Sequence, residues 1–228
     1  RTIGGYGGKF AVCAPDYSGL IPAGYTKVES PTPLVWMLMR IAPTYVNEKE
    51  VEACRRLQAQ VSITPMSQMG KSDYDAASYN HKLDLGVPDV SSDPLNFFRI
   101  ANKYIQINGP QQGEQALMTL FGEIGFRTSC DFNPELLTVP QKKGLLRGVT
   151  AGKEMINTCI TNGNNIYNGW TIPSKDMGNY GYNYLTRAAM TMQSIVAFPW
   201  EEAIYIVGCK DVDGNDLNGA NEYVLHFA

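Results

Sequence analysis

The sequence is poor in the side chains that build metal and proton-transfer sites. Among its 228 residues there are only two histidines, His81 and His226, and they do not share a helix face. No two of the five cysteines are close enough in sequence for a zinc knuckle or a Cys-x-x-Cys redox pair. A Gly-x-Ser-x-Gly nucleophile elbow is also absent. We therefore expect no metal and no cofactor, and the sequence names no catalytic residue. The sequence leaves two alternatives for the cysteines: free thiols throughout, or a disulfide such as Cys130–Cys159.

Long apolar runs and strong net charge are missing as well. The nearest apolar run, residues 33–43, is interrupted by Arg40 and is too short for the roughly 20 residues of a membrane-spanning helix. Nineteen basic and 22 acidic residues give a formal net charge of −3, which provides no field to attract nucleic acid or an anionic membrane. We expect neither a membrane span nor a nucleic-acid partner.

The length suits one large domain or two smaller ones. The chain begins at Arg1 and ends at Ala228, directly after an apolar, strand-like run. This pattern led us to expect a fragment of a longer polypeptide.

The first part of the chain has the pattern of a β-sandwich. Residues 9–14, 25–29 and 34–41 are predicted strands at close spacing, separated by Gly and Pro turns. The third is apolar on both faces, which predicts a central, buried strand. After it, Asn47 is predicted to cap a helix over residues 48–60, whose first turns are acidic. Residues 51, 54 and 57 would form its inner stripe. Residues 62–93 are predicted to be a polar surface loop.

The middle of the chain is predicted to be helical. Asp93-Pro94 is a strong helix start, and apolar residues then recur at helical spacing. Further helices are predicted at 113–124, at Asn133-Pro134 and from Pro140 to about residue 162. We therefore divide the chain into a first β-sandwich part (1–92), a helical subdomain (93–163) and the start of a second sandwich (164–228).

The last part is predicted to hold a helix at 180–193, a strand at 203–210 and a returning strand at 223–227. Asp213-Gly214 and Asn218-Gly219 between the strands are typical of hairpin turns. Asp211, Asp213 and Asp216 offer oxygens to calcium, but their spacing is not that of an EF-hand loop. We favour the interpretation as turns.

Two arginines lie in otherwise apolar predicted elements. Arg40 interrupts the third strand, and Arg187 lies in the helix at 180–193. A half-buried guanidinium needs a carboxylate or carbonyl partner. Structural ion pairs are the favoured explanation, and anion binding is the alternative.

Several of these segments resemble a known pair of families. The run Val-Trp-Met-Leu-Met-Arg at 35–40, after Pro-Ala-Gly-Tyr and Ser-Pro-Thr, is similar to the end of the family called domain of unknown function 1254. Asp-Pro-Leu-Asn-Phe-Phe at 93–98 resembles its helical part. Segments 184–189, 201–205, 211–214, 217–219 and 223–227 look like the start of its usual partner, domain of unknown function 1214.

The resemblance implies a fold more than a function. It implies an α+β, multidomain protein, with two β-sandwich (jelly-roll-like) domains and a helical segment between them. No general activity is established for these families. Bacterial members often carry export signals, and others occur in algae and large viruses. A secreted, periplasmic or particle-associated location is therefore implied.

Two functions follow as hypotheses. The first is a non-catalytic module that acts through its surfaces, which the Tyr-rich patch Tyr180, Tyr182 and Tyr184 favours because Tyr is enriched at interfaces. The second is a hydrolase-type enzyme with a ligand pocket between the sandwiches, lined by Arg40, Trp170, Arg187 and Asp213. A sandwich that stops after one hairpin would expose an apolar edge. We therefore expect further polypeptide or a partner chain to complete it, with a homo-oligomer as one form of this.

Overall fold

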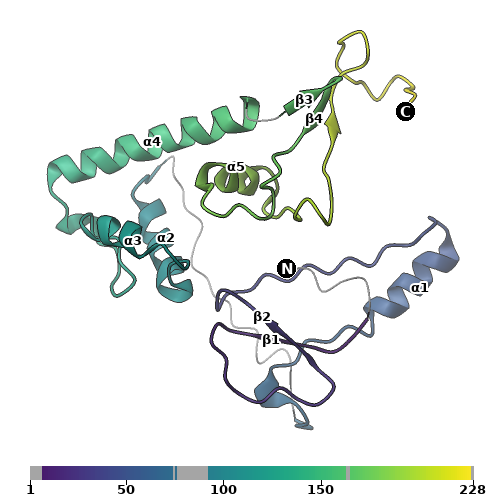
Figure 1. The fold of residues 1–228 in the computed structure, drawn as a ribbon, viewed down its shortest axis with the longest axis horizontal. Coiled ribbons are helices and arrows are strands. Elements are labelled where there is room, and N and C mark those ends of the chain that lie inside the picture. The colour runs from purple at the N-terminus through teal and green to yellow at the C-terminus, as the bar shows by residue number, and fades with distance from the viewer. Residues whose placement is uncertain (1–6, 74, 76–91, 163–164, 227–228) are drawn as a thin grey trace. The chain divides into compact units, whose positions relative to one another are not determined.

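A computed structural model of the chain describes residues 7–73, 75, 92–162 and 165–226 (Figure 1). The chain forms two compact units, an N-terminal unit over Gly5–Thr138 and a C-terminal unit over Val139–Ala228. Both mix helix with sheet, as the α+β prediction requires. His81 and most of the predicted polar loop at 62–93 lie outside the described residues. The predicted domain boundaries at 92 and 163 stay predictions.

The first two predicted strands are present. β1 (Phe10–Cys13) and β2 (Thr26–Glu29) pair in parallel, with Phe10 opposite Thr26 and Cys13 opposite Glu29. Along β1 the side chains alternate: Ala11 and Cys13 are buried, whereas Phe10 and Val12 are more exposed. This pair forms a small local core.

The predicted third strand at 34–41 is wrong for this structure, in which residues 35–43 belong to no strand. The chain enters this segment through side-chain bonds that engage the backbone. The Ser30 hydroxyl donates to the Thr32 carbonyl at 2.7 Å, and the Thr32 hydroxyl donates to the Leu34 carbonyl at 2.8 Å. The Leu34 N–H donates to Asn108 Oδ1 at 3.2 Å. A strand also needs a partner beside it, and the segment is exposed instead of central.

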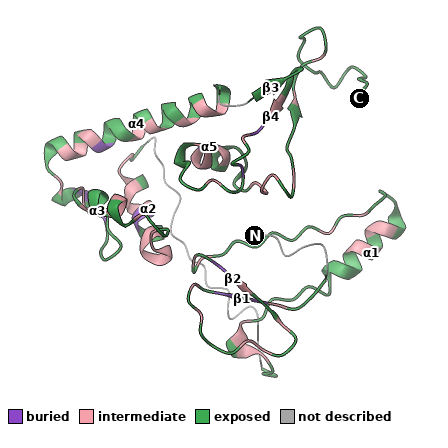
Figure 2. Ribbon diagram, in the orientation of Figure 1, coloured by how far each residue is buried: buried purple, intermediate pink, exposed green. Residues whose placement is uncertain are grey.

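Helix α1 (Glu48–Gln58) begins where the sequence predicts. Asn47 accepts the Glu50 N–H at 3.0 Å, and the Glu50 carboxylate accepts the Tyr45 N–H at 2.9 Å. These bonds satisfy backbone donors at the helix start. No residue of α1 is fully buried (Figure 2); of the predicted inner stripe, Val51 and Cys54 are half-buried, whereas Leu57 is exposed. A short 3₁₀ turn, η1 (Met66–Gln68), follows.

The helical part of the N-terminal unit comprises α2 (Asn96–Asn108), α3 (Gln115–Gly122) and the 3₁₀ turn η3 (Pro134–Leu136). The Asp93 carboxylate accepts the Asn96 N–H at 3.2 Å and pairs with Arg99 at 2.9 Å, so the predicted helix start is confirmed. Asn133 caps η3 as predicted. The buried residues here are Ile100, Asn102, Phe132 and Pro134.

The C-terminal unit contains two helices in contact, α4 (Val139–Asn162) and α5 (Tyr184–Ser194). Helix α5 begins later than the predicted residue 180, because Asn183 caps it by accepting the Thr186 N–H at 3.2 Å. β3 (Asn165–Tyr167), β4 (Trp170–Ile172) and β5 (Val207–Gly208) form an antiparallel sheet in that order. Buried side chains among the described residues of this unit are Leu145, Pro173, Met177 and Ala189.

Two predicted strands are shortened or missing. Of residues 203–210 only Val207–Gly208 forms a strand, and residues 223–226 form none. The Tyr223 hydroxyl instead accepts the Asn218 N–H at 2.9 Å, so this side chain folds back onto the preceding turn. All five cysteines are free thiols, Cys130 and Cys159 included.

Candidate functional site

The predicted pocket residues are distributed over both units. Arg40 is exposed in the N-terminal unit, whereas Trp170, Arg187 and Asp213 belong to the C-terminal unit. A Cβ added to Gly208 would lie 2.9 Å from the Trp170 indole, so this ring covers Gly208 on the neighbouring strand.

The Arg187 guanidinium contacts an aromatic ring of its own helix. It lies 5.1 Å from the centroid of the Tyr184 ring, which is a cation–π arrangement. The Asp213 N–H donates to the Asp211 carboxylate at 3.0 Å. These contacts are local ones, and a pocket shared with Arg40 stays a prediction.

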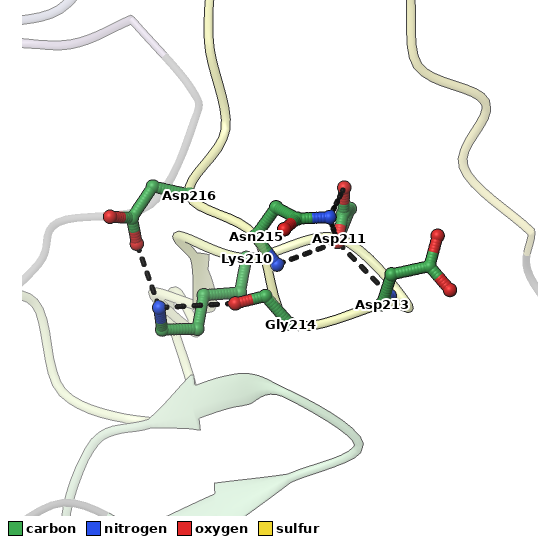
Figure 3. Close-up of polar contacts among 6 residues, drawn as sticks. All are labelled: Lys210, Asp211, Asp213, Gly214, Asn215 and Asp216. Carbon is green, nitrogen blue, oxygen red and sulfur yellow. Dashed lines mark hydrogen bonds and ion pairs between the residues drawn. The ribbon is translucent and has the colours of Figure 1, made fainter.

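The acidic segment 210–216 is a hairpin turn (Figure 3). The Asp211 carboxylate accepts the backbone N–H groups of Asp213 at 3.0 Å and Asn215 at 2.9 Å. Asp216 pairs with Lys210 at 2.8 Å, and Lys210 also donates to the Gly214 carbonyl at 3.3 Å. Gly214 has a φ of +83°, a conformation that Gly adopts without strain. The interpretation of Asp213-Gly214 as a turn is confirmed.

Lys210 and Asp216 form one ion pair in this hairpin, and Asp211 is stabilised by backbone N–H groups instead of a cation. Backbone N–H donation, mainly from Asn215, holds the pKa of Asp211 below its ordinary value of 3.8. The hydrogen bond to Asp216 raises the pKa of Lys210 above 10.5. Within the described part of the chain, no group of three or more His, Cys, Asp or Glu side chains is placed to hold a metal ion.

An open, shallow hollow lies beside α3. It has a volume of about 510 Å³. One wall comes from α3, with Met118, Thr119 and Glu123 at or near the helix. The other comes from the loop Arg127, Thr128 and Ser129. The lining therefore combines the apolar side chains of Met118 and Pro110 with hydroxyls and one charge of each sign.

The fully buried side chain of Asn102, on α2, fixes that loop at both ends. Its Oδ1 accepts the Arg127 N–H at 2.9 Å, and its Nδ2 donates to the Cys130 carbonyl at 2.8 Å. The Arg127 side chain is held separately, because its Nε donates to the Gly122 carbonyl at 3.0 Å. Thr128 and Ser129 lie between the two fixed points. The backbone of a loop held in this way has little freedom to lose on binding.

Sequence reasoning missed this hollow and the residue that orders it. The only signal was Asn102 itself, a polar residue four positions after Phe98 on the inner side of a helix. A buried amide must find hydrogen-bond partners, but the partners lie 25 and 28 residues away in sequence. The pattern alone does not identify them.

Residues 35–39 form an exposed apolar run in the described part of the N-terminal unit. Val35, Trp36, Met37, Leu38 and Met39 are between 48% and 62% exposed. Within the described ranges, their backbone N–H groups have no backbone partner. The segment therefore combines exposed apolar side chains with backbone N–H groups that are free of backbone partners.

Comparison with known protein families finds a match for the first part of the chain. Residues 1–65 match the family model described as a protein of unknown function, DUF1254. This match confirms the DUF1254 part of the resemblance over 65 of 228 residues. Pairing with domain of unknown function 1214 stays a prediction. A search of curated proteins found no match.

None of the helices in the described residues has the length and apolar character needed to cross a membrane.

Proposed function

We propose that this protein is a non-catalytic, exported, envelope or particle-associated module that acts through surface interactions. In this proposal its sheets belong to β-sandwich (jelly-roll-like) domains that another polypeptide completes. The observation that carries the proposal is the exposed apolar segment 35–39, whose backbone N–H groups have no backbone partner. Such a segment is a template for pairing with another strand.

We propose that the strand that pairs with residues 35–39 is the same segment of a second copy of the protein. In an antiparallel pair centred on Met37, Val35 would face Met39 of the copy, Trp36 would face Leu38, and Met37 would face itself. Every cross-strand pair would then be apolar, which is the favourable case for strand pairing. The arrangement has two-fold symmetry, so one surface serves both copies.

Light scattering across a range of protein concentrations tests this proposal. We expect the wild-type protein to associate and Val35→Asp to weaken association about tenfold or more, because the carboxylate would be buried opposite an apolar side chain. Val212→Asp is the matched control. Val212 is 99% exposed in the hairpin turn, so the same chemical change there leaves association intact.

Two results would overturn the proposal. One is a wild-type protein that stays monomeric at every concentration. The other is an equal effect of Val35→Asp and Val212→Asp, which would assign the change to charge and not to pairing.

The alternative is a hydrolase-type enzyme with a site between two sandwiches. It rests on the predicted pocket residues, and the local contacts of Trp170, Arg187 and Asp213 add nothing in its favour. A thermal-shift screen with small acids and metals distinguishes it, because an upward shift that Arg187→Ala abolishes would favour a ligand site.

A further inference from the structure

We propose that the hollow beside α3 binds a small organic monocarboxylate, with Arg127 holding the carboxylate. This site is separate from the strand pairing at residues 35–39 and does not depend on it. The inference begins with the hollow itself, about 510 Å³, into which the loop 127–129 contributes three successive polar residues.

Arg127 is the group that recognises charge. Its Nε is engaged by the Gly122 carbonyl at 3.0 Å, and this bond fixes the guanidinium beside the C-terminal end of α3. The two terminal amino groups remain as a planar pair of donors. That geometry matches the two oxygens of a carboxylate.

The rest of the lining defines the ligand class. Thr128 and Ser129 line the hollow, and their hydroxyls can donate to a bound oxygen. Met118 and Pro110 offer apolar surface for a hydrocarbon body. Glu123 also lines the hollow, and its negative charge disfavours ligands with more than one anionic charge. A singly charged acid with an apolar body therefore fits better than phosphate.

Preorganisation supports the assignment. Asn102 holds the backbone at Arg127 and at Cys130, so the residues between these points are already in place before a ligand arrives. Substituting the Arg127 side chain leaves the backbone bond to Asn102 intact. Binding can therefore be tested without removing the bond that orders the loop.

The test is an NMR titration of the protein with hexanoate, with the neutral hexanamide and inorganic phosphate as comparison probes. We expect hexanoate to shift the amide signals of Thr128 and Ser129 with a dissociation constant of roughly millimolar or tighter. Hexanamide should bind at least about tenfold more weakly, because it lacks the charge that Arg127 recognises.

Two variants complete the experiment. Arg127→Gln should weaken hexanoate binding about tenfold or more, whereas Arg99→Gln, the same change at an arginine paired with Asp93, should leave it unchanged. The proposal is overturned if hexanoate causes no shift at these amides, if hexanamide binds equally well, or if Arg127→Gln binds like the wild type. Binding of phosphate alone would also overturn the assignment to a monocarboxylate.

Discussion

The Asn102 side chain holds Arg127 in place from a distance of 25 residues in sequence: its Oδ1 accepts the Arg127 N–H at 2.9 Å. The same side chain reaches the Cys130 carbonyl with its Nδ2. One buried amide thus orders the whole loop that lines the hollow. This relationship links the stability of the helical part of the N-terminal unit to the geometry of its candidate site.

Replacing Asn102 should therefore lower the free energy of unfolding more than replacing a neighbouring polar residue does. Asn102→Ala leaves a backbone donor and a backbone acceptor unpaired, and we expect a loss of about 2–3 kcal/mol in the free energy of unfolding. Gln106→Ala is the matched control, because Gln106 lies one turn later on α2 and bonds the same loop through Asp131, at the surface. Its loss should be about 1 kcal/mol or less. Urea unfolding measures both, and equal losses would contradict the role given to Asn102.

Gly178 should tolerate no side chain. Its φ is +76°, and an added Cβ would lie 2.7 Å from Pro199 Cα and from the Phe198 carbonyl carbon, so backbone must move. We expect Gly178→Ala to destabilise the C-terminal unit by about 3 kcal/mol or more. Gly181→Ala separates the two causes, because Gly181 also has a positive φ, +51°, but open space around its Cβ position. That variant should cost only about 1–2 kcal/mol. Thermal or urea unfolding of both gives the comparison, and similar losses would show that the close approach to Pro199 is unimportant.

The hairpin at 210–216 should respond to pH at both extremes. The pKa of Asp211 is lowered in the folded hairpin, so its stabilising effect is present above the ordinary value of 3.8 and is lost as pH falls through the lowered value. The pKa of Lys210 is raised, so its contribution is complete below 10.5 and is lost as pH rises through the raised value. The amide shifts of Asp213 and Asn215 should therefore stay constant from about pH 5 to about pH 9.

Substitution of Asp211 gives the control for this pH dependence. Asp211→Asn keeps an oxygen to accept the two N–H groups but removes the titrating proton, so the acidic transition that Asp211 causes at the Asn215 amide should disappear. A transition in the wild type at the ordinary value of 3.8, or one that persists in Asp211→Asn, would contradict the assignment.

Local signals in the sequence predicted most helix starts. Contacts between residues far apart in the sequence could not be predicted from it. Asn47, Asp93 and Asn133 each bond a backbone N–H two or three residues away, so the residue types suffice to locate the helix start. Strands depend on partners elsewhere in the chain. Residues 34–41 have a strong strand pattern but lack a neighbouring strand among the described residues, and the pattern cannot reveal this.

The candidate site shows the same difference between local and long-range contacts. The hairpin turn around Gly214 was predictable, because its bonds connect residues at most six apart. The hollow was not, since Asn102 and the loop 127–129 meet only through tertiary packing. Residues with distinctive local patterns, such as Arg187, proved to make local contacts.

The central claim is that residues 35–39 pair with a second copy of themselves, and cysteine cross-linking tests it most directly. An antiparallel pair centred on Met37 would place the two copies of that residue opposite each other, within the Cα separation that a disulfide spans. The exposed thiols Cys130 and Cys209 are first replaced by serine to remove other cross-links. We expect Met37→Cys to form a covalent dimer on mild oxidation. Trp36→Cys should not, because its two copies would lie about 7–8 Å apart on the diagonal. A Met37→Cys protein that stays monomeric, or equal cross-linking of both variants, would contradict the account.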